Sequence, residues 1–343
     1  MRSLVRIFVA TLAFSSAASL IAQQPTVLHS QMTTETATHG LKGVLEGVMR
    51  ESAPVWIGYS VQVANRFSTG WSSDSVEYLE GHDGYSISES DGDQHSSDHA
   101  VILLRVANGA VTKVDVESAD RQLDAGGLKF IWLNGVDADD SVKTLTEIAK
   151  GSDIHQLRDS AIFAISLHQT ATATAALVSL AQPGNELELR EKAAFWLANE
   201  RGRDGFLAIQ RMAREDSDAD FREKLTFDLT LSKDPAALDE IIRMAHDDAS
   251  PKVRKQAQFW MATKGGKKVS GDLRALATND PNEQLRKSAV FALSRLPGDE
   301  AATQLIAVAD SSKDPAVRKQ AIFWLGQSSD PRALDYLTKL LKQ

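Results

Sequence analysis

The chain has 343 residues, of which 43% are hydrophobic and 24% are charged, and its formal net charge is −8. This composition is typical of a soluble globular protein, and the length allows two domains. The chain contains no cysteine, which excludes disulfides, thiol chemistry and lipid attachment through an N-terminal cysteine.

Residues 1–22 have the pattern of a secretory signal peptide. Arg2 and Arg6 form a basic start, the apolar run IFVATLAF follows, and the small-residue run SSAAS leads to cleavage after Ala18 or Ala22. The apolar run is too short to span a bilayer, and no later stretch reaches about 18 apolar residues. We therefore expect an exported chain, periplasmic or secreted, with no membrane span after cleavage. The alternative for this segment is a buried N-terminal helix.

Residues 23–138 lack the periodic pattern of the rest of the chain and predict a small α+β head domain. The segment 40–51 can form one amphipathic helix, while 55–64 and 126–135 are rich in residues that favour strands. An Asn-Gly pair lies between two strand-like runs in 101–116, which is the pattern of a β-hairpin. The residues of this head do not suggest a family, and we expect it to cap the N-terminal end of the following region.

The segment 66–100 is rich in Ser, Asp and Gly and predicts a long polar loop. On a helix, His95 and His99 would share one face, with His82 nearby, and could hold a metal ion. However, this segment has poor helix propensity and lacks the spacing of a twelve-residue calcium loop. A solvated acidic loop is therefore the preferred interpretation, and the three histidines are weak metal candidates.

Residues 139–343 contain a repeat with a period of 32 residues and no insertion. One column consists of phenylalanine: Phe163, Phe195, Phe227, Phe259, Phe291 and Phe323. Five residues before each phenylalanine stands an arginine: Arg158, Arg190, Arg222, Arg254, Arg286 and Arg318. One column of alanine and one of leucine or isoleucine recur with the same period. The pattern indicates six copies of one structural unit.

Each unit predicts two helices. The first has apolar residues at i, i+3 and i+4, as in LDEIIRMAHDD at 238–248. The second follows a polar N-cap such as Asp218 or Asn282, and Pro251 occupies a first helical position, where its missing N–H costs nothing. Such hairpins cannot bury both faces alone, so the six units must stack into an α-solenoid. The stretch 330–343 repeats the first helix only and predicts a capping helix.

The repeat region resembles the short HEAT-like repeats of PBS-lyase HEAT-like proteins, and DPAVRKQAIFWLG at 314–326 carries this resemblance. The resemblance implies a mainly α fold, an armadillo-like helical solenoid over about 139–343 after the α+β head. Some HEAT-like proteins are hydroxylases that bind two irons through His-Glu pairs, but this chain contains no His-Glu dipeptide. Others attach bilins to antenna proteins, a role that export argues against. The sequence shows no catalytic constellation, and it predicts neither an enzyme nor a cofactor.

The phenylalanine column lies about 160° from the centre of the core stripe, which in one unit contains Val253, Ala257 and Met261. Two interpretations remain open. In one, the phenylalanines pack sideways between adjacent second helices. In the other, they form a partly exposed ladder on the concave surface that binds a partner.

The candidate partner-binding residues include the phenylalanine column and two further groups. Trp196, Trp260 and Trp324 follow alternate phenylalanines. The residue after each arginine is acidic in the first three units and then becomes Lys255, Lys287 and Lys319. This change of sign would orient an extended partner along the solenoid.

The charge of the chain is divided unevenly. Residues 23–140 carry 18 acidic and 7 basic side chains, whereas 141–343 carry 28 and 29. An acidic head and a near-neutral solenoid do not suggest binding to nucleic acid or to an anionic membrane. The preferred hypothesis is an exported, non-catalytic HEAT-like scaffold of the bacterial cell envelope that binds protein or peptide. The alternative is an enzyme or metal-dependent module, lyase-like or other, with its chemistry in residues 82–99.

Overall fold

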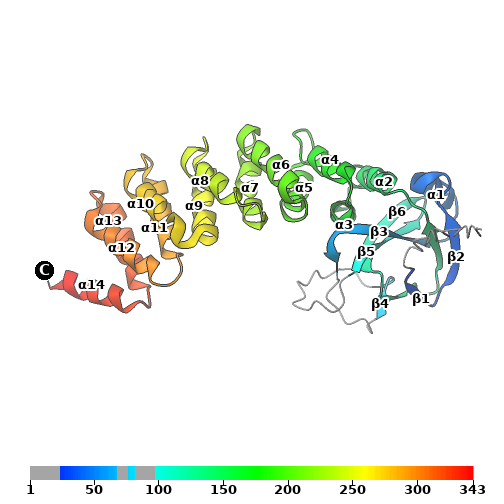
Figure 1. Ribbon diagram of the computed structural model, residues 1–343, viewed down its shortest axis with the longest axis horizontal. Coiled ribbons are helices and arrows are strands. Elements are labelled where there is room, and N and C mark those ends of the chain that lie inside the picture. The colour runs from blue at the N-terminus through cyan, green and yellow to red at the C-terminus, as the bar shows by residue number, and fades with distance from the viewer. Residues whose placement is uncertain (1–23, 68–75, 82–96, 343) are drawn as a thin grey trace, which may run out of the picture.

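The computed structural model describes residues 24–67, 76–81 and 97–342, and Figure 1 shows them as an elongated arch. A head built on strands lies at one end of the arch, and helices continue from it to the C-terminal end. The predicted mainly α fold, a solenoid with a small α+β head, is confirmed. The predicted signal peptide, residues 1–22, lies outside the described residues. Among the helices within them, none combines the length and apolar character needed to cross a membrane.

A mixed five-stranded sheet forms the centre of the head. Its strands, in spatial order, are β2 (Gln31–Thr36), β8 (Lys129–Asn134), β3 (Val55–Phe67), β5 (Ser97–Ala107) and β6 (Ala110–Ser118). β8 is parallel to both β2 and β3, whereas β3, β5 and β6 are antiparallel. Asn108 and Gly109 connect β5 to β6 with φ angles of 54° and 77°, the left-handed values that such tight hairpins require. The predicted hairpin is confirmed, as are the strands predicted within 55–64 and 126–135.

A second, three-stranded sheet consists of β1 (Thr26–Leu28), β7 (Gln122–Asp124) and β4 (Val76–Tyr78), paired in parallel through β7. Helix α1 (Gly40–Val48) confirms the amphipathic helix predicted within 40–51. The loop predicted over 66–100 is wrong in part, because β3 continues to Phe67, β4 lies inside the segment and β5 begins at Ser97. Strand pairing depends on backbone hydrogen bonds, which polar side chains on exposed positions do not prevent.

The two faces of the large sheet belong to different hydrophobic cores, because successive side chains of a strand point to opposite faces. Trp56, Leu103 and Phe130 pack in one cluster with Leu123 of the small sheet. On the other face, buried residues such as Ile102 belong to a core that continues through the solenoid. Helix α3 packs against β3 and β6 on this side. The head therefore closes the N-terminal end of the solenoid core, as the sequence predicts.

Six helix hairpins follow the head within the described residues. The outer helices are α2 (Ala138–Gly151), α4 (Ala171–Leu180), α6 (Gly202–Glu215), α8 (Ala237–Asp247), α10 (Ser270–Asn279) and α12 (Glu300–Ser311). The second, or inner, helices of the hairpins are α3 (His155–Leu167), α5 (Leu187–Glu200), α7 (Ala219–Leu231), α9 (Pro251–Gly265), α11 (Glu283–Ser294) and α13 (Pro315–Gly326). In Figure 1, α3 and α9 lie on the concave side of the arch. A 3₁₀ turn over Gly266–Val269 precedes α10. The predicted N-caps Asp218 and Asn282 accept backbone hydrogen bonds, and Pro251 occupies the first turn of α9.

The arginine column links neighbouring hairpins. Arg222 donates from Nε and Nη2 to the two carboxylate oxygens of Asp248, which lies in the next hairpin, with both distances 2.9 Å. Arg286 donates from Nε and Nη2 to one carboxylate oxygen of Asp314 in the next hairpin, at 3.1 and 2.6 Å. Within its own hairpin, Arg254 donates to the backbone oxygen of Asp248 at 2.6 Å. The predicted structural role of this column, pairing with loop carboxylates and carbonyls, is confirmed.

A buried hydrogen-bond chain joins the head to the first hairpin. Tyr59 of β3 lies 2.8 Å from the Ser141 hydroxyl of α2, and that hydroxyl lies 2.9 Å from Nε2 of His168 at the end of α3. Nδ1 of His168 donates to the carbonyl of Ala164 at 2.8 Å, because a carbonyl can only accept. Nε2 must then accept the Ser141 proton in the neutral ring. Every member of the chain is satisfied only while His168 is uncharged.

The stability of the protein is expected to fall as the pH falls from about 6.5 to about 4. Burial lowers the pKa of His168 to about 4. Between that value and the ordinary pKa of about 6.5, the ring is protonated in the unfolded chain but stays neutral in the native protein. The shift corresponds to roughly 3 kcal/mol of unfolding free energy, present above pH 6.5 and lost by pH 4. Urea unfolding at several pH values measures it against His168→Gln, which does not titrate. Equal pH slopes for the two proteins over this range would contradict the assignment.

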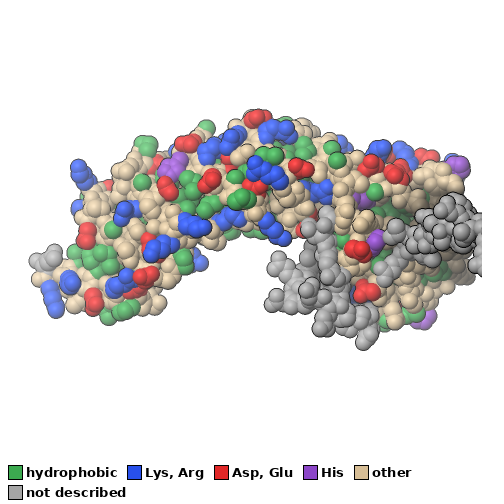
Figure 2. Space-filling view, viewed as in Figure 1, with side chains coloured by type: hydrophobic (Ala, Val, Ile, Leu, Met, Phe, Trp, Pro, Cys, Tyr) green, Lys and Arg blue, Asp and Glu red, His purple; other side chains and the backbone are tan. Residues whose placement is uncertain are grey.

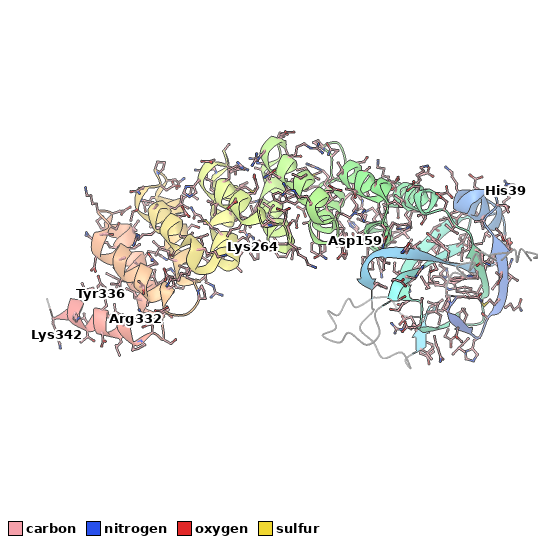
Figure 3. The ribbon with its side chains drawn as sticks, viewed as in Figure 1. His39, Asp159, Lys264, Arg332, Tyr336 and Lys342 are labelled. Carbon is pink, nitrogen blue, oxygen red and sulfur yellow. The ribbon has the colours of Figure 1, made fainter. Side chains whose placement is uncertain are left out.

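Helix α14 (Pro331–Leu341) follows the last hairpin, and Figure 3 labels its residues Arg332 and Tyr336 and, just after it, Lys342. Tyr336 donates to Asp310 at 2.7 Å, and Arg332 donates to the backbone oxygen of Asp299 at 2.7 Å. These bonds hold α14 against α12. The predicted capping helix is confirmed, and its charged side chains are exposed as expected.

Candidate partner-binding surface

The aromatic side chains of the inner helices lie in contact along the concave side of the solenoid. We call this set the aromatic ladder: Phe163, Phe195, Phe227, Phe259, Phe291, Phe323, Trp196, Trp260 and Trp324. Three phenylalanines each contact the tryptophan of the next inner helix, with ring centroids 4.8 Å apart for Phe163–Trp196, 5.0 Å for Phe227–Trp260 and 5.1 Å for Phe291–Trp324. Such contacts recur because each unit repeats the same positions at the same helical phase.

Further contacts divide the ladder into two groups of rings. Within one helix, Phe259 and Trp260 meet edge to face at 4.8 Å, and Phe259 also stacks on Phe291 at 6.1 Å with an interplanar angle of 9°. These contacts connect the rings of α7, α9, α11 and α13. The rings of α3 and α5 form the other group, which Phe67 of the head joins at 6.1 Å from Phe163. Phe67 could not be predicted as a neighbour of the ladder, because it lies outside the repeat region.

Exposure of the phenylalanines increases along the solenoid. Phe163 is 7% exposed, the next four are half-buried, and Phe323 is 53% exposed. The rings therefore pack sideways between neighbouring inner helices and still leave edges at the surface, so each of the two interpretations of the column describes part of the arrangement. Their role in binding a partner stays a prediction.

The tryptophans of the ladder carry unused hydrogen-bond donors. The indole Nε1 atoms of Trp196, Trp260 and Trp324 are buried and have no hydrogen-bond partner within the described residues. In the head, by contrast, Trp56 donates to Glu80 at 2.8 Å and Trp132 to Asn134 at 3.2 Å. A buried donor without a partner costs about 1–3 kcal/mol, so these three indoles are held in place by ring packing and not by hydrogen bonds.

The charge column beside the ladder is more asymmetric than its sequence suggests. Two of its acidic members pair closely with lysines of the next inner helix, Glu223 with Lys252 at 2.7 Å and Asp159 with Lys192 at 2.8 Å. Among its basic members, Lys287 pairs with Glu283 of its own helix, and Lys255 and Lys319 are exposed and have no ion-pair partner within the described residues. Figure 2 shows basic side chains along the concave edge of the middle of the solenoid. The unpaired charges of this column therefore lie mainly at its C-terminal, basic end.

The weak metal candidates are not brought together in the part of the chain that the structure describes. His82 and His95 lie outside the described residues. His99 lies in β5 opposite Gln62, and its Nδ1 is 2.8 Å from the carboxylate of Asp98. Within the described ranges, no group of three or more histidines and carboxylates could hold a metal ion.

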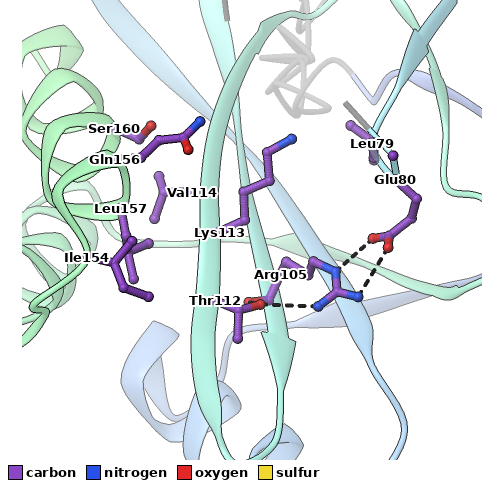
Figure 4. Close-up of a pocket in the computed structure, with 11 residues that line it drawn as sticks. Leu79, Glu80, Arg105, Thr112, Lys113, Val114, Ile154, Gln156, Leu157 and Ser160 are labelled. Carbon is purple, nitrogen blue, oxygen red and sulfur yellow. Dashed lines mark hydrogen bonds and ion pairs between the residues drawn. The ribbon is translucent and has the colours of Figure 1, made fainter. Parts of the chain in front are cut away.

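A cavity of about 280 Å³ lies between the head and α3, and Figure 4 shows its lining. The guanidinium of Arg105 crosses its floor and bonds both carboxylate oxygens of Glu80, at 2.7 and 3.1 Å, and the hydroxyl of Thr112 at 3.2 Å. Ile154 and Leu157 of the first hairpin form an apolar wall. The guanidinium of Arg105 is already bonded to Glu80 and Thr112, so it is not free to bind an anionic ligand in this cavity. We therefore take the ladder, not the cavity, as the candidate binding surface.

Comparison with known proteins identifies the class of repeat. Residues 271–343, from α10 to the C-terminal end, match a family model described as HEAT repeats. This segment is thus a HEAT-repeat segment, and the resemblance carried by 314–326 is confirmed. HEAT-repeat scaffolds use extended concave surfaces to bind proteins. No curated protein matches the sequence.

Three solved structures illustrate the similarity. Human deoxyhypusine hydroxylase is 17% identical with a TM-score of 0.32, and the match covers 60% of this chain and 80% of that one. Escherichia coli YibA is 21% identical with a TM-score of 0.37, covering 60% and 79%. The CpcE–CpcF complex of phycocyanin lyase from Nostoc sp. is 17% identical with a TM-score of 0.26, covering 55% and 98%.

Proposed function

We propose that this chain is an exported, non-catalytic scaffold of the bacterial cell envelope that binds an extended protein segment along the aromatic ladder. The observation that carries the proposal is the ladder itself, a row of rings in contact whose members from Phe195 to Phe323 leave edges at the surface. Aromatic rings supply large contact areas at low entropic cost. The half-buried and exposed ring edges along the inner helices are the part of the ladder that such a segment can contact.

The export part of the proposal is supported by the pattern of residues 1–22. Mass spectrometry of the protein recovered from a bacterial host tests it. Export predicts a mature chain that begins at Ser19 or Gln23, after cleavage at Ala18 or Ala22. An uncleaved chain that stays in the cytoplasmic fraction would contradict it.

Binding is tested with a phage-displayed library of random dodecapeptides, selected on the chain without residues 1–22. Enriched peptides are expected to bind Phe323→Ser about tenfold or more weakly, because an exposed ladder ring acts as an anchor for the bound segment. Leu207→Ser is the matched control, since Leu207 is 44% exposed but lies on the outer helix α6. Its affinity should stay within about twofold of the unmodified chain. Equal losses in both variants, or no enriched peptide, would contradict the proposal.

A further inference from the structure

Asp228 on α7 is an acidic residue that directly follows a phenylalanine of the aromatic ladder, Phe227. On each of the five remaining inner helices, the residue after the phenylalanine is tryptophan or alanine. The side chain lies almost wholly inside the protein, since Asp228 is 4% exposed. Its Oδ2 atom is buried and has no hydrogen-bond partner within the described residues. No ring contact joins Phe195 to Phe227 across this position, which separates the two groups of rings.

The repeat register indicates which way Asp228 faces. It occupies on α7 the position that Trp260 occupies on α9, and Trp260 lies against Phe227 of the preceding inner helix. Asp228 accordingly faces α5, which carries Phe195 and Glu191. Burial raises the pKa of Asp228 well above its ordinary value, and the charge of Glu191 raises it further. The two carboxyl groups thus sense each other across the interface between α5 and α7.

Lys224 is the cation that acts on both carboxyl groups. Lys224, one turn before Asp228 on α7, has its Nζ 4.0 Å from a carboxylate oxygen of Glu191, and its side chain is 59% exposed. Burial also raises the pKa of Glu191, with Lys224 opposing the effect. A buried carboxylate oxygen without a hydrogen bond, as Oδ2 of Asp228 is within the described residues, is costly, and a second cation would satisfy it. Half-buried Phe195 and Phe227 lie on the same two helices and can contact the stem of a long side chain.

We propose that Asp228 and Glu191 form a subsite for a cationic side chain, lysine or arginine, of the segment bound along the ladder. The subsite rests on the proposed function and specifies its partner: an extended, largely apolar segment with one basic residue near its middle. The exposed Lys255 and Lys319 lie on the C-terminal side of the subsite. They favour acidic residues in the part of the segment that passes them.

The subsite is tested with small probes that do not depend on peptide binding. N-acetyl-lysine methylamide and N-acetyl-arginine methylamide are titrated into the chain without residues 1–22, and NMR records the indole signals of Trp196 and Trp260. N-acetyl-norleucine methylamide, which has the lysine stem without the charge, serves as the neutral probe. We expect the cationic probes to bind about tenfold or more tightly than the neutral one.

The Asp228→Asn variant should weaken the cationic probes by about tenfold or more while leaving the fold intact, because asparagine has the shape of the uncharged acid. Asp239→Asn, at an exposed position on the outer helix α8, is the control and should change nothing. No binding of either cationic probe, equal binding of the neutral probe, or equal affinities in the two variants would overturn the subsite.

Failure of the subsite can be told apart from failure of the proposed function. If cationic probes bind through Asp228 but the library gives no peptide that depends on the ladder, the subsite stands and the proposed function is wrong. If ladder-dependent peptides lack a basic residue and bind Asp228→Asn unchanged, the subsite is wrong and the proposed function stands.

Discussion

Replacing Asp248 by alanine is expected to lower the free energy of unfolding by about 3–5 kcal/mol. Its carboxylate receives two hydrogen bonds of 2.9 Å from Arg222, and the two side chains are 3% and 11% exposed. The variant leaves the guanidinium of Arg222 buried without its counterion, in the interface between two hairpins. The cost is that of an unpaired buried charge, which exceeds the net value of the pair itself.

Urea unfolding measures this effect, with Asp220→Ala as the control. Asp220 also pairs with a basic residue of the next inner helix, Lys252, at 2.7 Å, but the two side chains are 62% and 54% exposed. Solvent screens such a pair, so its loss should cost less than about 1 kcal/mol. Similar losses for the two variants would show that the arginine column does not join the hairpins as described.

Replacing Leu293 by alanine is expected to cost about 2–5 kcal/mol, because it removes a large side chain from a closely packed core. Leu293 lies on α11 and is 0% exposed, in the stripe that faces the solenoid core. Lys287→Ala on the same helix removes a surface side chain and should stay within about 0.5 kcal/mol. Thermal and urea unfolding compare the two. Equal losses would mean that the helical phase of the repeat is assigned wrongly.

The solenoid could be predicted from the sequence because every unit has to solve the same packing problem. Each hairpin needs apolar residues at the same helical phase and an arginine near the start of its inner helix. The amino-acid sequence therefore repeats with a period of 32 residues. In the head, by contrast, strands such as β2, with the sequence QMTTET, depend on backbone pairing with β8. Their side chains are mostly polar and exposed, and nothing in the alternation of residues distinguishes them from a loop.

The recurrence of phenylalanine could be predicted from the sequence, but the contacts between the rings could not. Spacing alone placed the phenylalanines away from the core stripe, whereas the contacts with Trp196, Trp260 and Trp324 depend on how closely the inner helices approach one another. The burial of Asp228 could not be predicted either, since an acidic residue at a helical position is usually exposed. Its only signal was a charge in a column that otherwise holds tryptophan and alanine.

The indole N–H signals of the tryptophans test the central claim most directly. In ¹⁵N-tryptophan-labelled protein, each signal is assigned by a Trp→Phe variant, and enriched peptides are then added. If the ladder is the binding surface, the signals of Trp196, Trp260 and Trp324 shift, because these indoles lie against the phenylalanine rings that the peptide would contact. The signals of Trp56 and Trp132, whose donors are already bonded in the head, stay in place. Shifts confined to the head signals, or unchanged ladder signals with a peptide that binds, would contradict the account.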